Sequence, residues 1–168
     1  MSKKIIFIVL MLVVVALISL HGKTGELTGS ITIAGSTSVQ PLAEELAQFF
    51  MQKNPHVQIF VQGGGSSAGI KAALLGTADI GNSSRNLRPS EQLYATTIAL
   101  DGIAIVVNPN NQLDGMTLQQ VQEVFSGEVT SWENLGVSSK NLRNKNIVLV
   151  NRETGSGTRG AFEELVME

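Results

Sequence analysis

Residues 151–165, NRETGSGTRGAFEEL, place an arginine ahead of a run of glycines and hydroxyl side chains. A helix-like pattern follows, because Ala161, Phe162 and Leu165 share one face at helical spacing. The first turn of a helix offers backbone N–H groups without intrahelical partners and the positive end of the helix dipole. A loop of this composition that opens a helix is therefore typical of an anion site.

Arg152 is the strongest single indication of this chemistry. Its planar guanidinium can bind an oxyanion through two parallel N–H groups. Ser156, Gly157 and Thr158 can then satisfy the remaining lone pairs with hydroxyls and backbone N–H groups. The structural alternative is a flexible glycine turn with an ordinary helix cap. An arginine four residues ahead of Ser156 favours anion binding over that alternative.

A second candidate is GSTSVQP at residues 35–41, which offers Ser36, Thr37 and Ser38 at the start of a predicted helix. The same residue types are favoured as plain N-caps. One cap is enough for one helix, so three hydroxyls exceed the structural need. The stretch therefore favours binding, although capping alone remains an alternative.

GGGSSAG at residues 63–69 fits more than one known pattern. Gly63, Gly65 and Ala68 match the dinucleotide fingerprint G-x-G-x-x-A after a strand. The acidic residue expected about 20 positions later is missing, since that region holds Arg85 and Arg88. No lysine follows the glycines as in a nucleotide P-loop. A second cradle of hydroxyls and amides for an anion is the better interpretation.

Ser67 keeps an enzymatic alternative open. Gly65, Ser67 and Gly69 match G-x-S-x-G, the nucleophile elbow of serine hydrolases. The histidine base of that arrangement follows the serine in the sequence, whereas His56 precedes Ser67 and no histidine follows it. A serine hydrolase therefore remains only an alternative, and the acidic residues form no credible catalytic pair. We expect no catalytic residue and no enzyme.

NSSR at residues 82–85 is a third polar loop, which carries Ser83, Ser84 and Arg85. Its structural alternative is a solvated turn. The three loops together supply many neutral donors and one or two arginines, without a base, nucleophile or metal ligand set. That combination indicates binding of an anion rather than chemistry on it.

The loops follow predicted strands at residues 31–35, 57–62 and 78–81. Helices are expected after the first two loops, and the first should present one apolar face made of Val39, Leu42, Leu46, Phe49 and Phe50. A long β-rich run covers residues 96–109. Alternating strands and helices predict an α/β fold with a largely parallel sheet, whose ligands bind beyond the carboxyl ends of the strands.

The composition changes near residue 108, where the turn-rich NPNNQLDG begins. We expect a first α/β domain at residues 31–107 and the start of a second α/β domain at 108–168. The last predicted helix reaches the final residue without a terminator, so the second domain looks truncated.

Residues 1–22 are predicted to be a signal peptide or N-terminal anchor, because Lys3 and Lys4 precede an uncharged run at 5–20. Residues 23–30 form a polar spacer. Without residues 1–22 the chain keeps 10 basic and 14 acidic residues, a net charge of −4, which argues against nucleic acid as a partner. The chain has no cysteine and two histidines, which argues against a metal site and leaves no thiol for lipid attachment. No cofactor is expected.

Four stretches resemble one family in order and spacing: GSTSVQPLAEELAQFF, VQGGGSSAGIKAALLGTADIGNSSR, VFSGEVTSWENLG and NRETGSGTRGAFEE. The chain is similar, from residue 31 to its last residue, to the phosphate-binding proteins of ABC-type phosphate importers, the PstS-like solute-binding proteins. The resemblance implies a periplasmic-binding-protein-like fold of two α/β domains that close on one phosphate. It further implies an exported monomer, periplasmic or on the outer face of the cytoplasmic membrane, that delivers inorganic phosphate to a membrane permease.

Position by position, the resemblance assigns phosphate contacts in all the loops. In the first domain these are Thr37 and Ser38 with Ser36 adjacent, Ser66, and Ser84 followed by Arg85. In the second domain they are Arg152, Ser156, Gly157 and Thr158.

The chain departs from the family in two respects. Well-known members carry an aspartate at the position of Ser84, which accepts the proton of hydrogen phosphate and repels sulfate. Serine repels nothing and Arg85 adds positive charge, so the resemblance leaves the choice between phosphate and another tetrahedral oxyanion, sulfate or molybdate, open. The family's chains are also much longer, so this sequence resembles an N-terminal fragment.

Overall fold

The computed structural model of the chain describes residues 26–138, 140 and 142–168. The predicted signal peptide or anchor at residues 1–22, and residues 23–25 of the spacer after it, lie outside the described residues. Among the residues that are described, no helix has the length and apolar character needed to cross a membrane.

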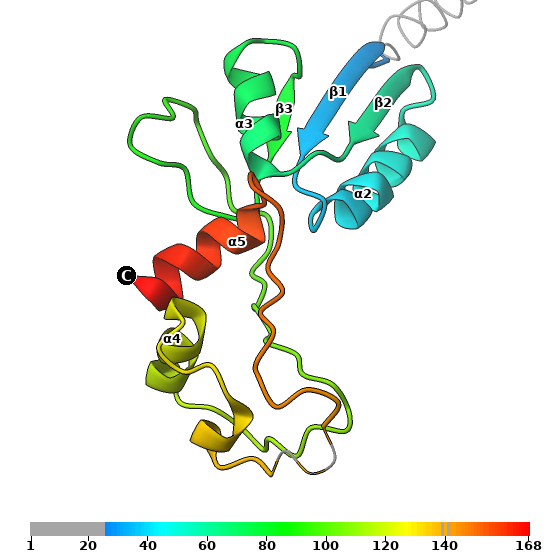
Figure 1. Cartoon of the computed structure of the whole chain (residues 1–168). Coiled ribbons are helices and arrows are strands. Elements are labelled where there is room, and N and C mark those ends of the chain that lie inside the picture. The colour runs from blue at the N-terminus through cyan, green and yellow to red at the C-terminus, as the bar shows by residue number, and fades with distance from the viewer. Residues whose placement is uncertain (1–25, 139, 141) are drawn as a thin grey trace, which may run out of the picture.

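A small parallel sheet forms the upper part of the molecule in Figure 1. It consists of β1 (Gly29–Gly35), β2 (Val57–Gln62) and β3 (Ile80–Asn82), in the order β2-β1-β3. Both neighbours run parallel to β1, with Ala34 opposite Gln62 and Gly35 opposite Asn82. The parallel α/β arrangement predicted from the sequence is confirmed. The three strands consequently end at the same edge of the sheet.

Two helices connect these strands: α2 (Gln40–Lys53) and α3 (Ser66–Leu74). Pro41 lies in the first turn of α2, where its missing N–H costs no hydrogen bond. The core between helices and sheet is made of small and branched apolar residues: Ala43, Ala47, Val57, Ile70 and Ala78. We call β1–β3 with α2 and α3, residues 29–82, the sheet unit.

The helix predicted at α2 is present, but its predicted apolar face is not buried. Leu46 is 53% exposed and Phe49 58%, whereas the two alanines Ala43 and Ala47 are the buried residues of the helix. The spacing correctly predicted a helix, but periodicity shows only which residues share a face. Burial requires a second layer, and no described residue covers that side of α2.

The remaining elements lie in the lower part of Figure 1. α4 (Leu118–Ser126) begins at a capping box between Thr117 and Gln120 and is followed by the 3₁₀ turn η1 (Trp132–Leu135). The C-terminal helix comprises α5 (Gly157–Phe162) and the π-helical turn η3 (Glu163–Met167). It packs on α4 through the rings of Phe125 and Phe162, whose centroids are 4.6 Å apart.

The strand predicted at residues 96–109 is not formed in the described structure. Leu100 is 95% exposed and Val106 85%, and a pairing partner is missing along the whole run. Outside β1–β3, the described residues contain one isolated bridge, between Ser131 and Asn146. Strand propensity is expressed only where a neighbouring strand supplies hydrogen bonds and a buried face, and neither is present here.

Candidate functional site

Three loops project from the carboxyl edge of the sheet and carry the predicted side chains. The first loop (36–39) follows β1, the second (63–65) follows β2 and the third (83–86) follows β3. Backbone bonds hold them together: Ser36 N–H donates to Asn82 O at 3.0 Å, and Gly65 N–H donates to Gly35 O at 2.9 Å. The edge of the sheet thus presents one continuous surface of loop backbone.

Three serine hydroxyls meet at the centre of this surface. Ser36 Oγ donates to Ser84 Oγ at 2.9 Å, and Ser66 Oγ lies 3.3 Å from Ser84 Oγ. Ser66 Oγ also accepts the N–H of Ser84 at 3.0 Å. Ser36 is 2% exposed and Ser66 is fully buried. We call Ser36, Ser66 and Ser84 the hydroxyl cluster; buried hydroxyls that bond mainly to one another can exchange those bonds for bonds to an oxyanion.

The start of α5 lies directly against this cluster. Ser156 caps the helix, because its side chain accepts the N–H of Arg159 at 3.4 Å. A Cβ placed on Gly157 would overlap Ser66 Oγ and would come within 2.5 Å of Ser84 Oγ. Only a glycine therefore allows the helix backbone to approach the hydroxyls this closely. The backbone N–H groups at the start of α5 lie beside the cluster as a result.

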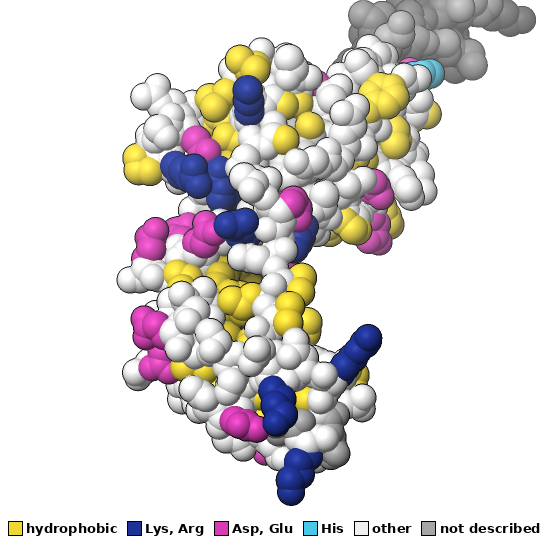
Figure 2. Space-filling view, viewed as in Figure 1, with side chains coloured by type: hydrophobic (Ala, Val, Ile, Leu, Met, Phe, Trp, Pro, Cys, Tyr) yellow, Lys and Arg dark blue, Asp and Glu magenta, His cyan; other side chains and the backbone are white. Residues whose placement is uncertain are grey.

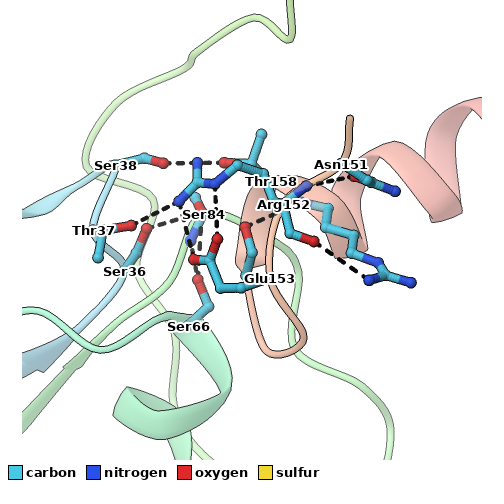
Figure 3. A network of polar contacts seen from close by, with 11 residues as sticks. Ser36, Thr37, Ser38, Ser66, Ser84, Asn151, Arg152, Glu153 and Thr158 are labelled. Carbon is cyan, nitrogen blue, oxygen red and sulfur yellow. Dashed lines mark hydrogen bonds and ion pairs between the residues drawn. The ribbon is translucent and has the colours of Figure 1, made fainter. Parts of the chain in front are cut away.

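Further contacts join the C-terminal segment to the sheet unit, as Figure 3 shows. Ser38 Oγ and Thr158 Oγ1 are 3.0 Å apart, and Arg152 Nη2 donates to Thr37 Oγ1 at 2.9 Å. A backbone bond runs from Ser67 N–H to Gly155 O at 3.2 Å. Of the predicted set, nine residues gather here: Ser36, Thr37, Ser38, Ser66, Ser84, Arg152, Ser156, Gly157 and Thr158.

Arg152 is held by an acidic neighbour that the sequence interpretation missed. Its Nε and Nη2 donate to the two carboxylate oxygens of Glu153 at 3.1 and 3.2 Å. These hydrogen bonds hold the pKa of Glu153 below its ordinary value. The signal was visible, since an acid directly follows the arginine in the sequence. Arg152 and Glu153 are 42% and 57% exposed, so this ion pair lies at the solvent side of the site.

Arg85, the tenth predicted residue, is engaged elsewhere. Its Nη1 and Nη2 donate to the Glu91 carboxylate at 2.8 and 2.7 Å, and Nη1 also donates to Asn86 O. The side chains are 4% and 16% exposed. Hydrogen bonding from Arg85, against an opposing effect of burial, lowers the pKa of Glu91 to about 2. The guanidinium therefore faces Glu91, a partner that the sequence interpretation did not identify.

Ser67 lies beside the site but without the surroundings of a nucleophile. Its backbone N–H points to Gly155 O, and no described residue forms a side-chain hydrogen bond with its hydroxyl. His56 precedes β2, whereas Ser67 follows it; a strand of six residues spans about 20 Å. Within the described ranges, no group of three or more His, Cys, Asp or Glu could hold a metal ion.

Figure 2 shows basic and acidic side chains intermixed on the face in view.

A family model described as "PBP superfamily domain" matches residues 22–168. The chain belongs to the PBP superfamily. Its structure is similar to that of a phosphate ABC transporter substrate-binding protein with bound phosphate from Clostridium perfringens, with a TM-score of 0.76, 43% identity, and coverage of 82% of this chain and 56% of that one. An ABC-type phosphate transport receptor from Vibrio cholerae gives a TM-score of 0.68 at 40% identity, covering 81% of this chain and 55% of that one.

Relatives found by sequence are likewise named phosphate-binding proteins. The phosphate-binding protein PstS 2 of Streptococcus pneumoniae is 45% identical over 112 residues, which are 66% of this chain and 38% of the relative. PstS of Bacillus subtilis is 34% identical over 146 residues, 84% of this chain and 47% of the relative. The chain thus spans about half the length of such relatives, or less. The resemblance to phosphate-binding proteins and the periplasmic-binding-protein-like α/β fold predicted from the sequence are confirmed.

Proposed function

We propose that this chain is the phosphate-capturing part of an extracytoplasmic solute-binding protein that delivers inorganic phosphate to an ABC-type import permease. The observation that carries the proposal is the hydroxyl cluster, which lies against the glycine start of α5, while Arg152 bonds to Thr37 next to Ser36. The names of the similar proteins support the same ligand.

In the proposed complex, neutral donors hold most of the anion. The hydroxyls of Ser36, Ser66 and Ser84 exchange their mutual bonds for bonds to phosphate oxygens. Gly157 and Thr158 add backbone N–H groups at the start of the helix. Arg152 supplies the one direct positive charge and turns from Glu153 toward the anion. Hydrogen bonds to a charged group are stronger than those between neutral groups, so this exchange favours binding.

The remaining predicted contacts form the rim of the site. Thr37, Ser38 and Ser156 extend the set of donors, because each already bonds to a group on the facing segment or at the start of the helix. Arg85 acts through the third loop rather than through direct contact, because Glu91 and Asn86 occupy its Nη groups.

A second candidate ligand is another tetrahedral oxyanion, sulfate or molybdate. The observation that favours it is the chemistry of the hydroxyl cluster, in which none of the described hydrogen bonds involves a carboxylate. A serine hydroxyl accepts the proton of hydrogen phosphate but does not repel an unprotonated dianion. Selection of phosphate over sulfate must therefore come from the hydroxyl acceptors alone, and we propose that it is weaker than a buried carboxylate would give.

The proposal includes the setting of the site. Residues 31–107 form the first α/β domain and residues 108–168 the start of a second, truncated one, with the cleft between them. Residues 23–30 are a spacer, and residues 1–22 direct export or anchor the chain. The protein acts as a monomer at the periplasmic or outer face of the cytoplasmic membrane. It uses no cofactor, metal or nucleic acid and catalyses no reaction.

Equilibrium dialysis of the full 168-residue chain against radiolabelled phosphate, then labelled sulfate, tests the proposal at neutral pH. We expect saturable phosphate binding with one site per chain. Stronger binding of sulfate than of phosphate would favour the second candidate, and binding of neither anion would contradict the proposal for this chain. A serine-reactive phosphonate that labels Ser67 would instead support the hydrolase alternative.

A further inference from the structure

Three consecutive residues of the third loop meet successive turns of the C-terminal helix. Ser84 lies against Gly157, since a Cβ on this glycine would come within 2.5 Å of Ser84 Oγ. Arg85 lies against Gly160, where a Cβ would come within 2.9 Å of Arg85 Cδ. Asn86 Nδ2 then donates to Glu164 Oε1 at 3.1 Å. Positions 157, 160 and 164 recur at helical spacing, so the loop runs along one side of the helix.

The Arg85–Glu91 ion pair gives this loop its shape. Glu91 accepts two bonds from the guanidinium and a third from the backbone N–H of Arg88 at 2.8 Å. Ser83 Oγ bonds to both the N–H and the C=O of Arg85. These hydrogen bonds connect residues within the segment 83–91, and Glu91 neutralises the charge of the Arg85 side chain that lies against Gly160.

We propose that Arg85, Asn86, Glu91 and Glu164 form a clasp that holds the C-terminal helix against the third loop and so positions Gly157 against the hydroxyl cluster. Their role in phosphate affinity rests on the proposed function, whereas their role in joining the helix to the sheet unit does not. Arg85 is accordingly a positioning residue whose effect reaches the ligand through Ser84 and Gly157.

Within the clasp the Arg85 side chain is buried against Gly160, whereas the Asn86–Glu164 bond is exposed. Arg152, which bonds to Thr37, is 42% exposed, and Ser38 and Thr158 also meet in an exposed bond. Exposed polar contacts contribute little, because water competes for the same groups. Arg85 is only 4% exposed and packs tightly beneath the helix, so loss of its partner leaves a buried charge.

The amide of Ser67 reports this junction without any ligand. Its N–H donates to Gly155 O, which belongs to the segment leading into α5. Hydrogen exchange at Ser67, followed by NMR on the full chain, therefore measures separation of the C-terminal segment from the sheet unit. Amides in the ladder between β1 and β2 serve as the internal reference, because general unfolding exposes them as well.

The first variant is Glu91→Gln, compared with Glu163→Gln as its matched control. Glu163 pairs with Arg159 on the same C-terminal helix, but that pair is exposed, at 38% for the arginine and 50% for the glutamate. We expect Glu91→Gln to accelerate exchange at Ser67 by about tenfold or more and to weaken phosphate binding by a similar factor, as loss of a charged hydrogen bond implies. The control should change either quantity by less than about twofold.

Asn86→Asp tests the clasp where Glu91→Gln fails to fold, since Asn86 and Glu164 are both exposed. The new carboxylate repels Glu164, so exchange at Ser67 should accelerate while the β1–β2 ladder stays protected. The double variant Asn86→Asp with Glu164→Gln should restore protection. A merely structural effect would not be rescued in this way.

The outcomes separate the two proposals. Faster Ser67 exchange and weaker phosphate binding in the variants support the clasp. Parent-like exchange in both Glu91→Gln and Asn86→Asp overturns the clasp, even when the parent chain binds phosphate. Faster Ser67 exchange in a chain that binds no phosphate supports the clasp and contradicts the proposed function.

Discussion

Gly157 lies so close to Ser66 that a side chain at position 157 would overlap the serine hydroxyl. This contact joins the start of the C-terminal helix to the buried centre of the sheet edge. It places the backbone at the start of α5 directly beside the hydroxyls of Ser66 and Ser84. The proposed phosphate affinity should therefore depend on how closely the two backbones approach.

Gly157→Ala tests that dependence. The added methyl must push α5 away from Ser66 and Ser84, and overpacking of this kind costs about 1–3 kcal/mol. We expect phosphate affinity to fall by roughly tenfold to hundredfold in equilibrium dialysis. Gly115→Ala is the control, because nothing lies within 4 Å of a Cβ at Gly115. Unchanged affinity in Gly157→Ala would show that the helix start does not contact the ligand.

Arg152→Ala should remove the one direct positive charge proposed for the site. Loss of a charge-assisted partner of a bound ion costs about 2 kcal/mol or more, which is roughly thirtyfold in the dissociation constant. Arg152→Lys should recover only part of that loss, since an ammonium cannot form the paired bonds of a guanidinium. Arg143→Ala controls for net charge. Calorimetric titration with phosphate measures all three, and parent-like affinity in Arg152→Ala would exclude the residue from the site.

Glu153→Gln should act in the opposite direction. Glu153 occupies the Nε and Nη2 groups of Arg152 that an oxyanion needs, so an arriving anion competes with a carboxylate. Removing that charge should tighten phosphate binding by about twofold to tenfold, a modest factor because the pair is exposed. Glu163→Gln removes one negative charge elsewhere and should leave the affinity unchanged. Weaker binding in Glu153→Gln would mean that Glu153 positions Arg152 rather than competing for it.

The three loops were predictable from the sequence because two physical requirements coincide there. Small residues with hydroxyls follow strands and begin helices, and parallel strands bring all their carboxyl ends to one edge. Residue type and order were thus enough to bring Ser36, Ser66 and Ser84 together. Their contact with Gly157 was less accessible to sequence reasoning, because it depends on how the C-terminal helix packs across the sheet edge.

The partners of the two arginines show why other parts of the site were missed. Glu91 reaches Arg85 across a loop without regular periodicity, so no spacing rule relates them.

The predictions of a strand at residues 96–109 and of a buried apolar face on α2 failed for a related reason. Each was predicted from local preference, whereas strand pairing and burial depend on a neighbouring layer that the described residues do not supply.

Ser84→Asp should increase the selectivity of the site for phosphate over sulfate. A carboxylate in the hydroxyl cluster can accept the proton of hydrogen phosphate but repels sulfate, which carries no proton at neutral pH. We expect sulfate binding to fall by at least about hundredfold, while phosphate binding stays within about tenfold of the parent. Ser84→Asn introduces a side chain of similar size without the charge and should not discriminate. Unchanged binding of both anions in Ser84→Asp would place position 84 outside the ligand's reach, and equal losses would show that the carboxylate does not select between them.

The stability of the chain toward acid should depend on Glu91. Its pKa is lowered from 4.5 to about 2 in the folded chain, chiefly by hydrogen bonds from Arg85. A carboxyl whose folded pKa is depressed contributes stability above its unfolded pKa and loses that contribution as the pH falls through the folded value. The contribution is therefore complete at neutral pH, declines below about pH 4.5 and is largely gone near pH 2.

Glu91→Gln removes this contribution at every pH. We expect it to lower the free energy of unfolding by about 3 kcal/mol at pH 7, in line with loss of one partner of a buried ion pair. The difference between parent and variant should shrink steadily between pH 4.5 and pH 2. Denaturant titrations at pH 7, 4 and 3 measure it, with Glu163→Gln as the exposed counterpart. A parent–variant difference that stays constant over this range would show that the ion pair is not the source of the stability, because only a carboxylate that loses its charge can produce the decline.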